Sequence, residues 1–100
     1  MGAIVFTRTG YGESVENAFR SAVEEAELMN GIGGYTGTIA EKSSFKVINR
    51  NELQEGETEY DLAYRLIEAS DPRVDDKWGP AGVISTENKN EWLFFGWASC

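Results

Sequence analysis

Residues 82–98 read GVISTENKNEWLFFGWA, and this stretch decides the fold. Two apolar runs, 82–86 and 91–98, stand on either side of the polar tetrapeptide 87–90. This pattern predicts a β-hairpin, because apolar residues are buried along both strands while polar residues turn the chain in solvent. From Trp92 onward the second run has apolar side chains at both odd and even positions, so this strand must be covered on both faces.

The first third of the chain predicts a strand followed by a helix. Residues 3–9 are rich in β-branched and aromatic side chains, which favours an internal strand. Ser14 belongs to a residue type that caps helix N-termini, and it precedes apolar residues at helical spacing. The helix is expected over residues 15–30, because the following glycine tolerates the left-handed conformation that ends helices.

The middle of the chain predicts short strands and a second helix. Residues 38–42 and 45–49 are expected to form two short strands, or one strand bent between them. Thr58 is a second N-cap, and it begins a helix that ends before Pro72, which cannot continue a helix. Residues 73–80 are expected to form a loop that leads into the hairpin.

These elements give the order β-α-β-(β)-α-β-β and an α+β fold in a single domain, residues 1–100. Two helices with one apolar stripe each need a sheet to lie on. We expect a mostly antiparallel sheet of four or five strands with both helices on one face. The other face would then be open, and a second copy of the chain is the simplest cover. The sequence therefore predicts a homo-oligomer.

Composition limits the classes of function. Seventeen acidic against nine basic residues give a net charge of −8, which argues against nucleic acid as a partner because phosphate binding needs a basic surface. There is no histidine, and Cys100 is the single cysteine. Histidine triads, cysteine clusters and internal disulfides are therefore excluded, and we expect no catalytic residue, no metal site and no cofactor. No stretch predicts a signal peptide or a membrane span, so a cytoplasmic protein is expected.

The first candidate site is a glycine-rich segment, residues 31–42, which reads GIGGYTGTIAEK. Clustered glycines allow a backbone to approach a ligand closely and to point its N–H groups at an anion. The segment is neither a Walker loop nor a dinucleotide fingerprint, and its alternative role is a helix end with a tight turn into the sheet. The candidate ligand-binding residues here are Gly33, Gly34, Tyr35, Thr36, Gly37 and Lys42.

The second candidate site is the loop around Lys77 and Trp78, which reads DDKWGP over residues 75–80. Lysine and tryptophan together can hold an aromatic anion by charge and stacking. The adjacent Asp75 and Asp76 lack the spacing of a calcium loop. In the alternative interpretation, the loop is purely structural and Trp78 fills the edge of the core.

Three motifs, GGYTGTIAEK at 33–42, DKWGPAG at 76–82 and FFGWAS at 94–99, resemble a group of small proteins encoded in bacteriophage genomes. The resemblance covers almost the whole chain and carries no catalytic assignment. It implies an accessory phage protein in the host cytoplasm. Such proteins often act against host defence, and some hold cyclic-nucleotide immune signals in pockets between subunits.

Two hypotheses of function follow, with a weaker third. The first is an oligomer that binds and sequesters a small anionic ligand of nucleotide type without turnover. Tyr35 and Trp78 would stack on bases, while Lys42 and Lys77 would meet phosphates. The alternative is an acidic inhibitor that binds a host defence enzyme. The third hypothesis is a phosphodiesterase or nucleotide-modifying enzyme that works through Asp75 and Asp76, with or without a metal.

Overall fold

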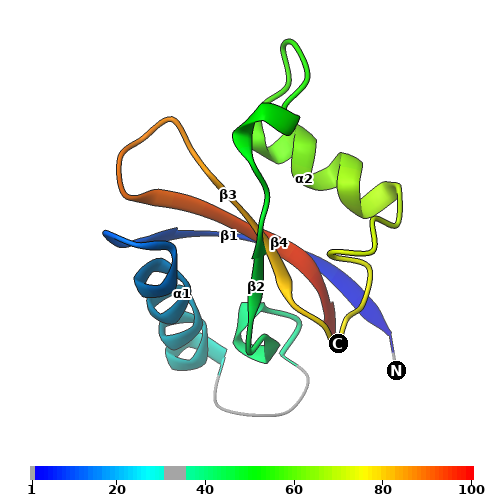
Figure 1. Cartoon of the computed structure of the whole chain (residues 1–100). Coiled ribbons are helices and arrows are strands. Elements are labelled where there is room, and N and C mark those ends of the chain that lie inside the picture. Colours follow the sequence, from blue (N-terminus) through cyan, green and yellow to red (C-terminus); the bar gives the residue numbers. More distant parts are fainter. Residues whose placement is uncertain (1, 31–35) are drawn as a thin grey trace.

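The hairpin at the C-terminus forms as predicted, and the sheet is built around it (Figure 1). β3 (Ala81–Ser85) and β4 (Glu91–Ser99) are antiparallel, and β1 (Ala3–Tyr11) pairs antiparallel with the other side of β4. β2 (Phe45–Val47) pairs in parallel with β3. The order across the sheet is therefore β1-β4-β3-β2, a mostly antiparallel sheet of four strands.

The computed structural model describes residues 2–30 and 36–100, and both predicted helices lie within this part. α1 (Val15–Asn30) begins where the Ser14 hydroxyl accepts the Asn17 N–H at 3.2 Å. α2 (Glu59–Glu68) begins at Thr58, whose side chain forms a reciprocal capping box with Asp61. The predicted α+β class and both predicted N-caps are thus confirmed. Neither helix has the length and apolar composition needed to cross a membrane.

The helices lie on opposite faces of the sheet, so the prediction that both share one face is wrong. Phe94 of β4 packs in a core cluster with Ala18 and Ala22 of α1. Phe95 packs in a second cluster with Leu62 of α2. Successive side chains of a strand point to opposite faces, so β4 supplies both cores at once. The two helices of one chain therefore cover both apolar faces of β4. The homo-oligomer was predicted to cover an open face, so it stays a prediction, but this reason for it no longer holds.

Each face of the sheet has a glycine where a helix or an aromatic ring approaches the backbone closely. A Cβ atom on Gly10 would lie 2.7 Å from the Ala18 carbonyl oxygen and 2.9 Å from the Phe94 ring. On the other face, a Cβ atom on Gly82 would lie 2.7 Å from the Phe95 ring. All three distances are shorter than a real Cβ atom tolerates, so the glycines at these two positions let the layers pack at this separation.

Residues 38–42 form a turn instead of the predicted strand. Ile39–Glu41 is a single 3-10 turn, capped by the Thr38 hydroxyl, which accepts the Ala40 N–H at 3.1 Å. The Glu41 carboxylate then accepts the N–H of Ser99 at the end of β4. This long-range bond overrides the β-propensity of the segment, and the strand that follows is limited to Phe45–Val47.

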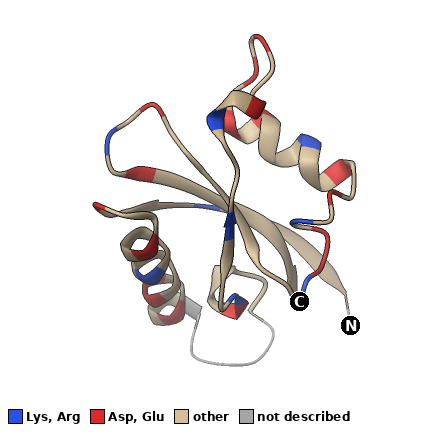
Figure 2. Cartoon of the chain, in the orientation of Figure 1, with Lys and Arg blue, Asp and Glu red and all other residues tan. Residues whose placement is uncertain are grey.

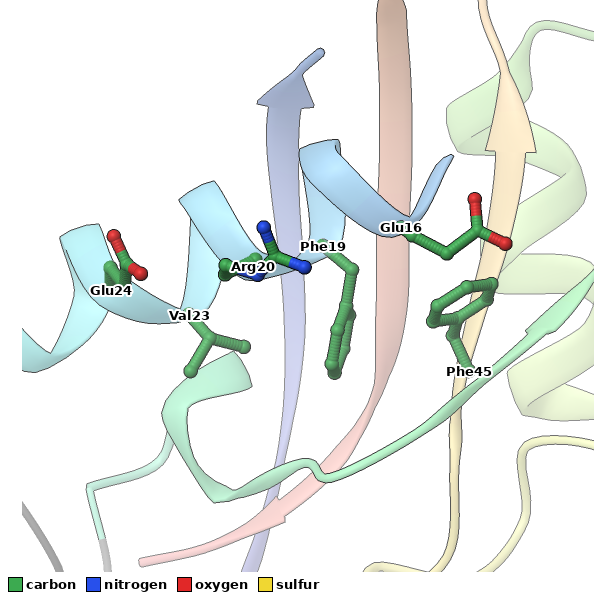
Figure 3. A pocket seen from close by; sticks show the side chains of 6 residues that line it. All are labelled: Glu16, Phe19, Arg20, Val23, Glu24 and Phe45. Atoms are coloured by element: carbon green, nitrogen blue, oxygen red, sulfur yellow. The ribbon is translucent and has the colours of Figure 1, made fainter. Parts of the chain in front are cut away.

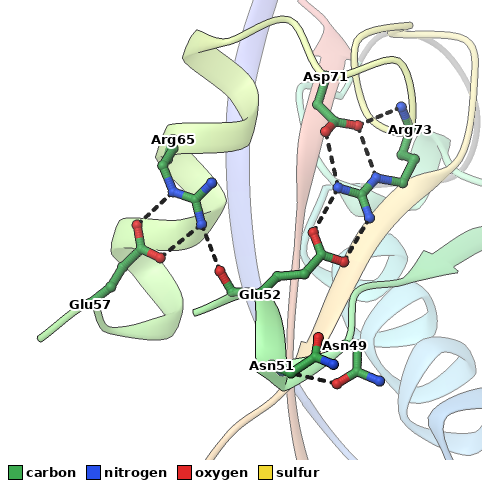
Figure 4. Close-up of polar contacts among 7 residues, drawn as sticks. All are labelled: Asn49, Asn51, Glu52, Glu57, Arg65, Asp71 and Arg73. Atoms are coloured by element: carbon green, nitrogen blue, oxygen red, sulfur yellow. Dashed lines mark hydrogen bonds and ion pairs between the residues drawn. The ribbon is translucent and has the colours of Figure 1, made fainter. Parts of the chain in front are cut away.

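Arg65 joins α2 to the segment before it, and Arg73 joins the segments before and after α2 to each other (Figure 4). Arg65 donates two hydrogen bonds to Glu57 and a third to the Glu52 carbonyl. Arg73 bridges the carboxylates of Glu52 and Asp71. The hydrogen bonds from Arg65, and one from the Gln54 backbone, lower the pKa of Glu57 to about 2. Bidentate pairs fix orientation more than they add stability at a surface, so they set how α2 meets the sheet.

Candidate functional site

The predicted site residues that the structure describes gather at one end of the sheet, where β4 ends and β1 begins (Figure 1). Thr36, Gly37 and Lys42 come from the segment after α1, while Lys77 and Trp78 come from the loop before β3. The other three predicted residues, Gly33, Gly34 and Tyr35, lie outside the described residues. The structure therefore brings the two candidate loops together, although they are far apart in sequence.

Glu41 organises the described part of the glycine-rich segment. Its carboxylate accepts the Gly37 N–H at 2.6 Å, the Thr36 hydroxyl at 3.1 Å and the Ser99 N–H at 2.8 Å. Gly37 has φ +70°, a value that favours glycine. The Gly37 N–H, which was predicted to meet an anion, is therefore used by a carboxylate of the chain itself. Sequence reasoning missed Glu41, because nothing in a lone glutamate indicates a partner 58 positions away.

Lys42 is buried and joins the two loops. Its side chain is 4% exposed, and its ammonium donates to the carbonyls of Asp76 (3.3 Å), Lys77 (3.0 Å) and Gly79 (3.0 Å). Burial lowers the pKa of Lys42, and the charges of Asp76 and Glu41 oppose that change. An ammonium has three hydrogens, and all three have acceptors here. Lys42 therefore holds the loop in place and has no hydrogen left for a ligand.

The exposed Trp78 and the half-buried Lys77 lie side by side in this region. Trp78 is 63% exposed, so the interpretation in which its ring fills the edge of the core is wrong. The Lys77 ammonium lies 5.3 Å from the centre of the Trp78 ring, within cation–π range, and 3.5 Å from the Gly2 carbonyl oxygen. The Trp78 N–H donates to Asp76 Oδ1 at 2.8 Å, which fixes the turn. Among the predicted site residues that the structure describes, Trp78 is therefore the most exposed.

A groove that sequence reasoning did not identify lies between α1 and β2 (Figure 3). Its floor is Phe19, Val23 and Phe45, and its volume is about 350 Å³. The Phe19 and Phe45 rings are 5.1 Å apart, and Phe19 also packs against Phe94 of the core at 5.7 Å. We call this hollow the α1–β2 groove. The helical stripe of α1 did predict Phe19 and Val23 as apolar, but not that their outer sides face solvent.

Three charged side chains of α1 form the rim of the α1–β2 groove: Glu16, Arg20 and Glu24. They follow one another at four-residue spacing, so they share one face of the helix (Figure 3). Figure 2 shows that α1 carries both acidic and basic positions. Within residues 2–30 and 36–100, none of the three belongs to an ion pair, whereas Glu25 on the adjacent face binds Arg8 at 2.7 Å. The groove thus combines an apolar floor with charges that have no partner in the described part of the chain.

In the described part of the chain, no three carboxylate or cysteine side chains come close enough together to hold a metal ion. Comparisons of the chain with protein families, with curated proteins and with solved structures give no match. The interpretation of function therefore depends on the geometry of these two surfaces.

Proposed function

We propose that this chain is a non-catalytic binding protein that engages another protein through the α1–β2 groove. The observation that carries the proposal is the groove itself, an apolar floor of two phenylalanines and a valine below three charges that form no ion pair with the described residues. Protein interfaces combine buried aromatic anchors with a polar rim in this way. The phenylalanines are already held by contacts with each other and with Phe94, so little side-chain freedom is lost on binding.

The rim and the overall charge indicate the chemistry of the partner. Glu16 and Glu24 outnumber Arg20, and the whole chain carries −8. A complementary partner would insert an apolar side chain between basic residues, because opposite charges speed association and select the partner. With the phage resemblance, the proposed partner is a host defence enzyme in the bacterial cytoplasm, which this protein would inhibit by occupying its surface.

Reversing the charge of the groove rim tests whether binding depends on this surface or on another part of the molecule. The double variant Glu16→Lys and Glu24→Lys changes two exposed side chains and should leave the fold intact. Affinity for a protein captured from bacterial lysate and then purified should fall by about tenfold to a hundredfold, measured by calorimetry or biolayer interferometry.

The matched control is the double variant Glu55→Lys and Glu68→Lys, which makes the same change of charge at exposed positions next to and within α2. It should bind nearly as the unmodified chain does. Equal losses in both variants would show that only total charge matters. An unchanged affinity in the rim variant would place the interface elsewhere and contradict the proposal.

A second candidate function is sequestration of a small nucleotide-type ligand, and the Lys77–Trp78 pair favours it. The exposed ring and the nearby ammonium can receive a base and a phosphate, respectively. Against it, Asp76 lies next to Lys77, and the hydrogens of Lys42 and the Gly37 N–H are already bonded. Any such site would depend on Lys77 as its main described cation.

Calorimetry with cyclic mono- and dinucleotides tests this second candidate. Trp78→Ala and Lys77→Ala should each weaken binding by about tenfold to a hundredfold, because stacking and a charge-assisted hydrogen bond are of similar strength. Lys89→Ala removes an equal charge from the exposed β3–β4 turn and should have no such effect. Absence of binding heat from the folded, unmodified protein would eliminate sequestration of these ligands.

A further inference from the structure

β1 forms one edge of the sheet and is paired on one side only, by β4, so the prediction that residues 3–9 form an internal strand is wrong. It is nine residues long, whereas the opposite edge strand, β2, has three. A long edge strand presents a row of free N–H and C=O groups that can pair with another chain. β1 therefore presents one row of backbone groups that β4 does not bond.

The register shows which residues of β1 present these groups. At the two ends of the ladder, the Gly12 N–H bonds the Asn90 carbonyl, and the Cys100 N–H bonds the Gly2 carbonyl. Hydrogen bonding alternates along an antiparallel pair, so the even-numbered residues of β1 point their backbone groups at β4. The odd-numbered residues point outward: Ala3, Val5, Thr7, Thr9 and Tyr11. In the described part of the chain, no other segment bonds to the backbone of these residues.

This edge lacks the features that usually prevent pairing. It contains no proline, and Arg8 is its single charged residue. The Arg8 guanidinium is bonded to Glu25 of α1, so that charge is already neutralised. Natural edge strands are normally protected by lysines, prolines or bulges. A hollow of about 280 Å³ also lies between residues 5–8 and residues 37–39, beside the middle of the strand.

We propose that β1 pairs antiparallel with β1 of a second copy of this chain, about a two-fold axis at Thr7. In this register Thr7 faces Thr7 of the partner subunit, Val5 faces the partner's Thr9 and Ala3 faces the partner's Tyr11. The two four-stranded sheets become one continuous sheet. Each chain then meets its predicted oligomeric partner through the edge of its sheet, and both faces stay covered by the helices.

Self-complementarity favours a second copy over a foreign strand. No two like charges face each other in this register, because Arg8 lies opposite the partner's Phe6. Threonine and valine pairs across strands are favourable. The two-fold axis also brings the two α1 helices to the same side of the joined sheet. Leu28 lies one turn beyond Glu25, on the β1 side of α1, and its 88% exposure would fall in the dimer.

Thr7→Lys is the decisive variant. It places two ammonium groups opposite each other across the two-fold axis. The backbone groups of residue 7 point away from β4, so the hydrogen bonds between β1 and β4 in the monomer stay intact. Sedimentation equilibrium of the unmodified protein, from micromolar to submillimolar concentration, should show a species of twice 11.1 kDa. Thr7→Lys should raise the dissociation constant by about tenfold or more. Ser43→Lys adds the same charge at an exposed position and should not.

A single cysteine tests the register in the Cys100→Ser background. Thr7→Cys should form an intermolecular disulfide on oxidation, because hydrogen-bonded partners across strands have Cα atoms about 5.5 Å apart. Thr9→Cys should not, since its two copies would be about 13 Å apart along the strands. A monomer at all concentrations, a dimer indifferent to Thr7→Lys, or crosslinking at position 9 and not at 7 would each overturn the proposal. If the protein were a monomer, a strand of another protein would become the alternative partner for the β1 edge.

Discussion

Replacing Phe94 with alanine is expected to lower the free energy of unfolding by about 3–5 kcal/mol, the usual cost of removing a buried phenylalanine. Phe94 is fully buried and packs against the rings of Phe19 and Phe45. The substitution leaves a cavity under α1 and also removes support from the floor of the α1–β2 groove. Urea denaturation followed by tryptophan fluorescence measures the change.

Phe94→Leu is the matched control, since it keeps most of the apolar volume and should cost less than about 1.5 kcal/mol. Val47→Ala, at a position that is 55% exposed, should change stability by less than about 0.5 kcal/mol. A loss below about 1 kcal/mol for Phe94→Ala would mean that α1 is not held to the sheet by this ring.

The second large effect is expected at Lys42. Lys42→Met keeps the length of the side chain but removes the ammonium that bonds the carbonyls of Asp76, Lys77 and Gly79. We expect a loss of about 2–4 kcal/mol, because charged hydrogen bonds are replaced by carbonyls that must find water. Hydrogen exchange of the 76–79 loop should also accelerate, since its anchor is gone.

Lys46→Met removes an equal charge from an exposed position on β2, four residues further along the chain. It should leave both stability and hydrogen exchange near their original values. If Lys42→Met behaved like Lys46→Met, the loop would be held by its own turn hydrogen bonds, and the buried ammonium would add little.

The local elements could be predicted from the sequence because their signals lie within a few residues. The polar tetrapeptide between two apolar runs, and the caps at Ser14 and Thr58, act over one turn of chain, and the structure confirms them. The placement of α2 could not be predicted in this way. An apolar stripe predicts that a helix packs against a sheet, but it does not predict which face of the sheet the helix covers.

The candidate site was predicted in part, for a similar reason. The sequence singled out Lys42, Lys77 and Trp78 by residue type, and the structure brings their loops together. Residue type alone did not show that the Lys42 ammonium would donate its hydrogen bonds to backbone carbonyls about 35 positions away. The α1–β2 groove was missed because it depends on Phe45 approaching Phe19 from a distant strand.

The pairing of β1 with β4 has a consequence for the order of events in synthesis. The Gly2 carbonyl accepts the N–H of Cys100, and β1 pairs with β4 along its whole length, so β1 is held by residues that are made much later than itself. Until β4 emerges, β1 and both helices lack the strand on which they pack. We therefore expect no stable, partly folded intermediate before β4 is made. Contacts between residues so far apart in sequence also make folding slow. Until β4 is made, β1 has no strand of its own chain to pair with. The net charge of −8 then helps to keep neighbouring nascent copies apart.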